Sequence, residues 1–161
     1  MKIKSFMTMM VAMTAVVCGF SACGSDDDGD VPLASQVVGS YAGDEKVVVS
    51  TEGYEEAATY VFTKNTDSSI DLAISAWGEG AMSFPQLPVK GVVLTQTGDI
   101  ISGKLMTPYT GTVKDTQGED KSYTVSDLVV VFSKNKVVLT YTLKYGRMPF
   151  DFVGQFVGTK K

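Results

Sequence analysis

The sequence has 161 residues, of which 44% are hydrophobic and 20% charged, with 14 Lys and Arg against 18 Asp and Glu. That length fits one globular domain of modest size. The chain has no histidine and only two cysteines, so it lacks the most common general base and metal ligand. The acidic balance and the scattered lysines argue against nucleic acid as a partner.

Residues 1–22 have the pattern of a signal peptide. Lys2 and Lys4 give a positively charged start, and an apolar run follows over residues 6–17. This run is too short to span a bilayer as a helix. We therefore predict a secreted protein whose first 22 residues are removed.

Cys23 follows this signal directly after the small residues Ser21 and Ala22. This arrangement resembles the lipobox of bacterial lipoproteins and implies cleavage before Cys23 and lipidation of its thiol. Cys18 is the competing position, but the bulky Val17 precedes it. Acyl chains on Cys23 would tether the protein to the membrane, because each buried methylene contributes about 0.8 kcal/mol.

Residues 23–35 are predicted to form a lipidated, acidic and flexible linker. The segment from Gly24 to Asp30 contains only Gly, Ser and Asp, and such a composition favours disorder. It also resembles the surface-export signal of lipoproteins in Gram-negative gut bacteria, which implies an outer-membrane, lipid-anchored protein exposed at the cell surface. The alternatives are a simple spacer and a location on the periplasmic face.

From residue 36 onward the hydrophobic pattern has a period of two. In the segment from Lys136 to Tyr145, Val137, Leu139, Tyr141 and Leu143 fall on one face of a strand. Gly, Asn and Asp turn signals separate further segments of this kind. The predicted strands are 38–50, 54–64, 69–77, 89–97, 100–106, 109–116, 121–133, 136–146 and 150–158.

We expect these strands to form an all-β, antiparallel up-and-down barrel of eight or nine strands. Closure of the sheet removes the two edges that would otherwise expose unpaired backbone groups. A two-sheet β-sandwich is the alternative architecture.

Several segments of residues 36–161 resemble the calycin-like, or lipocalin-like, lipoprotein domain of gut bacteria. The most specific is Tyr145-Gly146-Arg147-Met148-Pro149-Phe150, and the opening Val38-Gly39-Ser40-Tyr41-Ala42-Gly43 agrees with it. The resemblance implies a lipocalin-like barrel on a lipid anchor, and it carries over no reaction, ligand or site residue. Gly146 and Pro149 also have a purely structural explanation as a tight connection between strands.

The sequence offers little for catalysis. Ser102 and Lys104 share a strand face, but a lysine acts as a base only when it is desolvated. A Ser/Lys hydrolase is thus the exception to our expectation that the protein is not an enzyme. We predict no catalytic residues, no metal site and no cofactor.

The barrel either binds one small ligand or is filled by its own side chains. An irregular apolar stretch between strands either forms a ligand portal or caps the core; its members are Trp77, Met82, Phe84 and Leu87. Further candidates for polar groups in a pocket are Tyr54, Tyr60, Tyr109 and Tyr123. The leading prediction is non-catalytic binding of a small apolar molecule or a short glycan. The alternative is a structural or protein-interaction module.

Overall fold

The computed structural model describes residues 31–161, and Pro32–Lys161 form one compact unit. Its elements are α2 (Leu33–Val37), β1 (Gly39–Val49), β2 (Glu52–Thr66), β3 (Ser69–Ile74), the 3-10 helix η1 (Gly80–Met82), β4 (Leu87–Thr97), β5 (Ile100–Lys104), β6 (Tyr109–Lys114), β7 (Asp120–Ser133), β8 (Lys136–Tyr145) and β9 (Phe152–Lys160). The predicted signal peptide, Cys23 and the acidic run lie outside the described residues.

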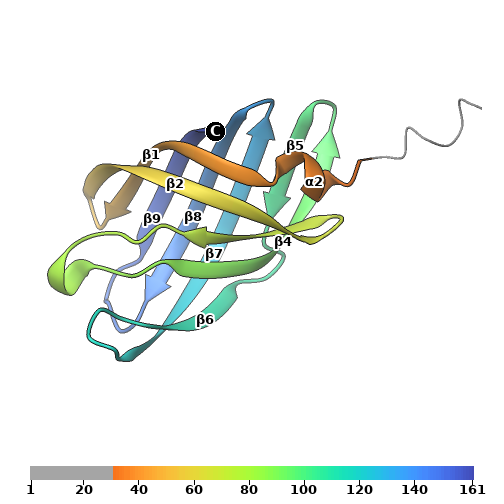
Figure 1. Cartoon of the computed structure of the whole chain (residues 1–161). Helices are drawn as coiled ribbons and strands as arrows, with labels where there is room; N and C mark the ends of the chain where they lie inside the picture. The colour runs from red at the N-terminus through yellow and green to blue at the C-terminus, as the bar shows by residue number, and fades with distance from the viewer. Residues whose placement is uncertain (1–30) are drawn as a thin grey trace, which may run out of the picture. The chain divides into compact units, whose positions relative to one another are not determined.

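The strands form one closed antiparallel barrel (Figure 1). Neighbours follow the order β5-β4-β3-β2-β1-β9-β8-β7-β6, and a further pairing of β5 with β7 closes the sheet. β5 and β6 pair with successive parts of β7, so together they occupy one of eight positions around the barrel. The predicted all-β antiparallel barrel is confirmed, and the two-sheet sandwich is wrong because a single sheet closes on itself.

The nine predicted strands all occur, with small differences at their ends. β3 ends at Ile74, three residues earlier than predicted, and the next amide, that of Ser75, donates a hydrogen bond to the Tyr60 hydroxyl at 3.4 Å. α2 begins at Leu33, inside the segment predicted as a flexible linker. Among the described residues, no helix is long and apolar enough to cross a membrane.

α2 covers one end of the barrel, where the hairpin turns β2–β3, β4–β5 and β7–β8 also lie; we call it the helix end (Figure 1). The Ala34 amide donates to the Asp67 carbonyl at 3.1 Å, and the Tyr41 hydroxyl donates to the Val37 carbonyl at 3.0 Å. The opposite end carries the connections β1–β2, β3–β4, β6–β7 and β8–β9, and we call it the loop end. An open site is therefore expected at the loop end.

Large side chains occupy the interior of the barrel. Fully buried members include Tyr41, Tyr60, Tyr141, Phe62, Phe152 and Phe156. Room for one of these rings comes from a glycine on the neighbouring strand: a Cβ on Gly154 would lie 2.1 Å from Cζ of Tyr141. The Tyr141 ring packs directly against the backbone of Gly154, so the interior accommodates a larger aromatic side chain here than it could beside a residue with a Cβ.

Candidate functional site

Aromatic rings seal the interior at the loop end. Trp77 and Phe84 exchange two backbone hydrogen bonds of 3.0 and 2.9 Å, and their rings stack at 5.8 Å. Both meet Phe152 edge to face, at 5.6 and 5.4 Å, and Phe84 also lies 5.8 Å from the Tyr145 ring. We call Trp77, Phe84, Tyr145 and Phe152 the aromatic plug.

The four predicted portal residues therefore have different positions. Trp77 and Phe84 belong to the plug, and Leu87 is completely buried in the core below it. Met82 lies on the 3-10 helix η1 with 42% of its surface exposed. The stretch lies at the loop end, and two of its four members, Trp77 and Phe84, take part in closing the mouth of the barrel.

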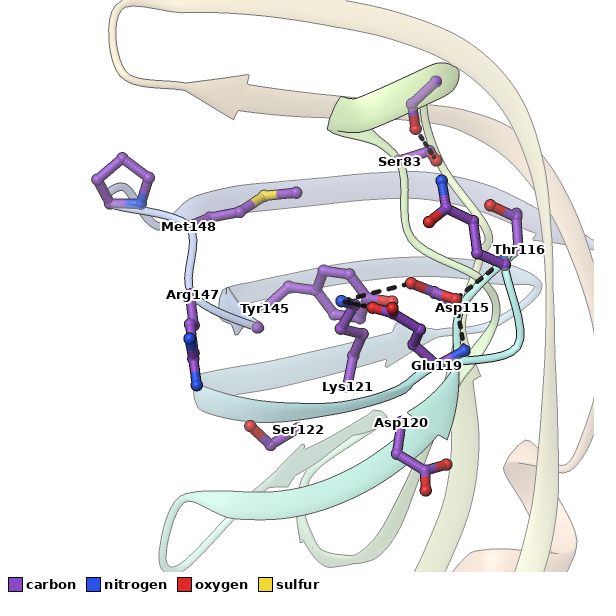
Figure 2. A pocket seen from close by; sticks show the side chains of 14 residues that line it. Ser83, Asp115, Thr116, Glu119, Asp120, Lys121, Ser122, Tyr145, Arg147 and Met148 are labelled. Carbon is purple, nitrogen blue, oxygen red and sulfur yellow. Dashed lines mark hydrogen bonds and ion pairs between the residues drawn. The ribbon is translucent and has the colours of Figure 1, made fainter.

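A cleft of about 880 Å³ lies at the loop end, bordered by three segments that are distant in sequence. Figure 2 shows Tyr145 between them, with Met148 and Arg147 on one side, Asp115 and Thr116 on the other, and Ser83 above. The lining residues are Gly80, Ser83, Asp115, Thr116, Gln117, Glu119, Asp120, Lys121, Ser122, Tyr145, Gly146, Arg147, Met148 and Pro149. Cavities of this size commonly hold small-molecule ligands.

One wall of the cleft is the β6–β7 turn, which Asp115 organises. Its carboxylate accepts hydrogen bonds from the backbone amides of Gln117 and Glu119, both at 2.9 Å. Both hydrogen bonds lower the pKa of Asp115, and the bond from the Glu119 amide has the larger effect. Lys121 joins the turn by ion pairs of 2.7 Å to Glu119 and 3.5 Å to Asp115, and the hydrogen bond to Glu119 is the main cause that raises its pKa. The wall thus presents ionised groups in a fixed arrangement.

The opposite wall is the β8–β9 connection. Gly146 takes a φ of +57°, which favours glycine, and its amide donates to the Ser122 carbonyl at 2.8 Å. The Met148 amide donates to the Tyr145 carbonyl at 3.3 Å. These two bonds hold the backbone on both sides of Arg147, whose side chain is exposed at the rim.

Tyr145 forms the boundary between plug and cleft. The residue is 3% exposed, and among residues 31–161 its hydroxyl has no hydrogen-bond partner. Burial is the main cause that raises the pKa of this phenol, and the nearby Asp115 carboxylate adds to the effect. A buried polar atom without a partner costs about 1–3 kcal/mol and is uncommon in folded proteins.

A second polar group lies inside the barrel. Glu45 is 1% exposed, and its Oε1 accepts hydrogen bonds from the hydroxyls of Tyr60, at 2.5 Å, and Tyr141, at 2.8 Å. Its Oε2 has no partner within the described part of the chain. Burial raises the pKa of Glu45 more than the two tyrosine hydrogen bonds lower it. Burial also raises the pKa of both tyrosines well above the ordinary value.

The sequence patterns do not single out Glu45 and Tyr145 as site residues. Glu45 lies on the face of β1 that also carries Tyr41, Val47 and Val49, so the period of two along that strand could have identified it as an inward carboxylate. Tyr145 falls in a segment that the sequence explains as a structural connection. The feature of the sequence that could have drawn attention to Tyr145 as a site residue is the nearby Arg147, the single arginine of the chain.

The four predicted tyrosines do not line the cleft. Tyr60 and Tyr123 are buried, Tyr109 is half-buried, and Tyr54 is exposed with its ring 5.6 Å from Trp77. The Tyr123 hydroxyl donates to the Pro88 carbonyl at 2.5 Å, and burial raises its pKa to about 12. Only Tyr60 takes part in a polar cluster, the one with Glu45.

Ser102 and Lys104 lie on the outward face of β5, where the inward positions belong to Ile101 and Gly103. Neither Ser102 nor Lys104 lines the cleft. Within residues 31–161, no group of three or more His, Cys, Asp or Glu side chains is arranged to hold a metal ion.

Comparison with known proteins supports the fold. No protein-family model and no curated protein matches the chain. Among solved structures, a protein of Bacteroides fragilis NCTC 9343 named "putative outer membrane protein" is similar to it, with a TM-score of 0.61 and 23% sequence identity. The match covers 82% of this chain and 54% of the other, so the chain spans about half the length of that neighbour.

Proposed function

We propose that the protein is a calycin-like lipoprotein of the outer membrane, anchored through Cys23 and exposed at the cell surface. Three observations support this: the lipobox pattern that ends in Cys23, the closed barrel, and a structural neighbour named "putative outer membrane protein". Each addresses a different property: the anchor, the fold and the compartment.

We further propose that the protein binds a short glycan, without catalysis, in the cleft at the loop end. The observation that carries the proposal is the cleft itself. It lies at the end of the barrel that the aromatic plug closes, and its walls carry ionised and hydroxyl side chains. Sugar hydroxyls need both acceptors and donors. Asp115 and Glu119 supply acceptors, Ser122 supplies a donor, and Met148 contributes apolar surface.

A small apolar ligand has less support. It would need an apolar cavity, whereas side chains such as Tyr60, Phe62 and Phe156 occupy the barrel interior. An apolar ligand in the cleft would also displace water from the polar walls and leave their hydrogen-bonding groups without partners.

Calorimetric titration of the lipid-anchored protein in detergent with a panel of oligosaccharides and fatty acids tests the proposal. We expect a member of the oligosaccharide panel to bind and the fatty acids not to bind. Glu119→Gln should weaken this binding about tenfold, because it removes a charged acceptor from the cleft wall. Glu52→Gln, at the exposed first residue of β2 and outside the cleft, is the matched control and should bind as the unchanged protein does.

Failure of every oligosaccharide to bind would contradict glycan binding. The filled interior would then favour the alternative, a structural or protein-interaction module of the cell envelope. If Glu119→Gln and Glu52→Gln weaken binding equally, the glycan does not bind in the cleft.

A further inference from the structure

β2 extends far beyond the strand that follows it in the sheet. It has 15 residues and β3 has six, and the ladder between them joins only Thr63, Lys64 and Thr66 of β2 to β3. In Figure 1, β2 and the segment after β3 diverge toward the loop end. Within residues 31–161, no ladder pair or further backbone hydrogen bond reaches this side of residues 53–61. This stretch of β2 is therefore an edge strand in the wall of the barrel.

The edge is held in position from its other side. β1 pairs with residues 52–62 of β2 without a register shift, and β1 pairs in turn with β9. Toward the segment after β3, the contacts pass through side chains: the Ser75 amide donates to the Tyr60 hydroxyl at 3.4 Å, and the rings of Tyr54 and Trp77 lie 5.6 Å apart. The backbone of the edge is thus extended and fixed, with N–H and C=O groups available for another strand.

The edge lacks most features that usually prevent pairing with another chain. Residues 53–61 contain no proline, no lysine and no bulge, all of which commonly protect edge strands. Ala57 is exposed and Ala58 half-buried, and their small side chains leave room for larger side chains of an added strand. The edge can therefore accept a further strand.

Negative charge decides which strand fits. Glu55 and Glu56 are adjacent and point to opposite faces of β2. Glu55 has a single ion pair, 3.7 Å to Lys46, and Glu56 has no ion pair or hydrogen bond in the described part of the chain. The residue opposite Glu56 on β1 is another glutamate, Glu45. Such an edge attracts a basic strand and repels a second copy of itself.

We propose that residues 53–61 of β2 bind a basic, extended segment of a partner protein by strand addition. Main-chain hydrogen bonds to the edge supply the affinity, and Lys or Arg side chains opposite Glu55 and Glu56 supply the selectivity. None of residues 53–61 lines the cleft, so this inference is independent of the proposed glycan binding.

Peptides with alternating side chains test this with the lipid-anchored protein in detergent. The two probes are acetyl-(Lys-Val)4-amide and acetyl-(Glu-Val)4-amide, titrated by calorimetry. We expect the lysine peptide to bind at least about tenfold more tightly than the glutamate peptide, with a preference that shrinks as salt is added. The bound lysine peptide should also slow hydrogen exchange of backbone amides within residues 53–61.

Backbone methylation separates strand addition from attraction between charges. Methylating every peptide nitrogen of the lysine peptide keeps its side chains and its charge, but it removes the backbone donors and blocks close approach to the edge. We expect the methylated peptide to bind at least about tenfold more weakly than the unmethylated one.

Two charge-reversal variants locate the selectivity on β2. Glu56→Lys should remove most of the preference for the lysine peptide, because it places a like charge opposite the added strand. Asp99→Lys, at the exposed β4–β5 turn of the helix end, changes the net charge by the same amount and should keep the preference. Both positions are exposed, so neither variant disturbs the core.

The remaining outcomes would overturn the proposal. If the lysine and glutamate peptides bind equally, or if Glu56→Lys and Asp99→Lys have the same effect, the basic partner is wrong. If no peptide binds, or if the methylated peptide binds as well as the unmethylated one, strand addition is wrong. If the protein alone forms dimers in which residues 53–61 are protected from exchange, the edge binds a second copy of the chain instead.

Discussion

Removing the tyrosine hydroxyls around Glu45 tests whether a buried carboxyl inside the barrel sets the stability of the fold. The proposed changes are Tyr60→Phe, Tyr141→Phe and their combination. Both hydroxyls donate to the same oxygen, Oε1 of Glu45, at 2.5 and 2.8 Å. Tyr60 additionally accepts from the Ser75 amide at 3.4 Å, so its loss should cost more.

The expected magnitudes follow from these contacts. A hydrogen bond to a neutral carboxyl contributes about 1 kcal/mol, and one to a charged carboxylate about 1.5–3 kcal/mol. Each single variant should therefore lose about 1–3 kcal/mol of unfolding free energy. The double variant should lose about 1 kcal/mol more than the sum, because the second substitution leaves a buried carboxyl without any donor.

The pH dependence provides a second measure. Burial raises the pKa of Glu45 in the folded protein, so the folded state keeps its proton where the unfolded chain has lost it. The free energy of unfolding therefore includes a contribution from this retained proton. The contribution is fully present below the ordinary glutamate pKa and is lost as the pH rises through the raised pKa of the folded state. Relative to Glu45→Gln, the unchanged protein should lose stability from about pH 4 toward neutrality.

Urea unfolding followed by the fluorescence of Trp77, the only tryptophan and a buried one, measures these free energies. Tyr123→Phe is the control, since the Tyr123 hydroxyl donates to a backbone carbonyl and its loss should cost about 1 kcal/mol at every pH. Either of two results would rule out this role for Glu45: a difference in unfolding free energy between the unchanged protein and Glu45→Gln that is constant with pH, or tyrosine variants that are as stable as the unchanged protein.

Three further changes test other parts of the structure. Gly154→Ala places a methyl group 2.1 Å from Tyr141 Cζ and should cost about 2–4 kcal/mol in urea unfolding, whereas Gly98→Ala, in open space, should cost only about 1 kcal/mol; equal costs would contradict the packing. Tyr145→Phe should leave the Tm unchanged or raise it, because its hydroxyl has no partner in the described chain, and a lowered Tm would reveal one. Cys23→Ser should move the protein from the membrane fraction to the soluble fraction, and retention in the membrane would contradict lipid anchoring.

Local sequence patterns are sufficient to predict the strands of this protein. Alternation along segments such as Lys136–Tyr145 is a local property, since successive side chains of a strand point to opposite faces. Turn signals such as Lys134-Asn135 are local as well, and they make consecutive strands pair as antiparallel neighbours. These two features, with the cost of open sheet edges, were sufficient to predict a closed barrel.

Which polar groups come together depends instead on how the strands and loops pack in three dimensions. The cleft brings together residues from η1, the β6–β7 turn and the β8–β9 connection, and no spacing in the sequence encodes their proximity. Tyr145 ends a strand by its pattern, yet its contact with Phe84 and its position at the cleft floor depend on how the loops fold over the barrel. Local alternation specifies which face a side chain occupies, whereas the curvature and register of the closed sheet specify what it faces across the interior.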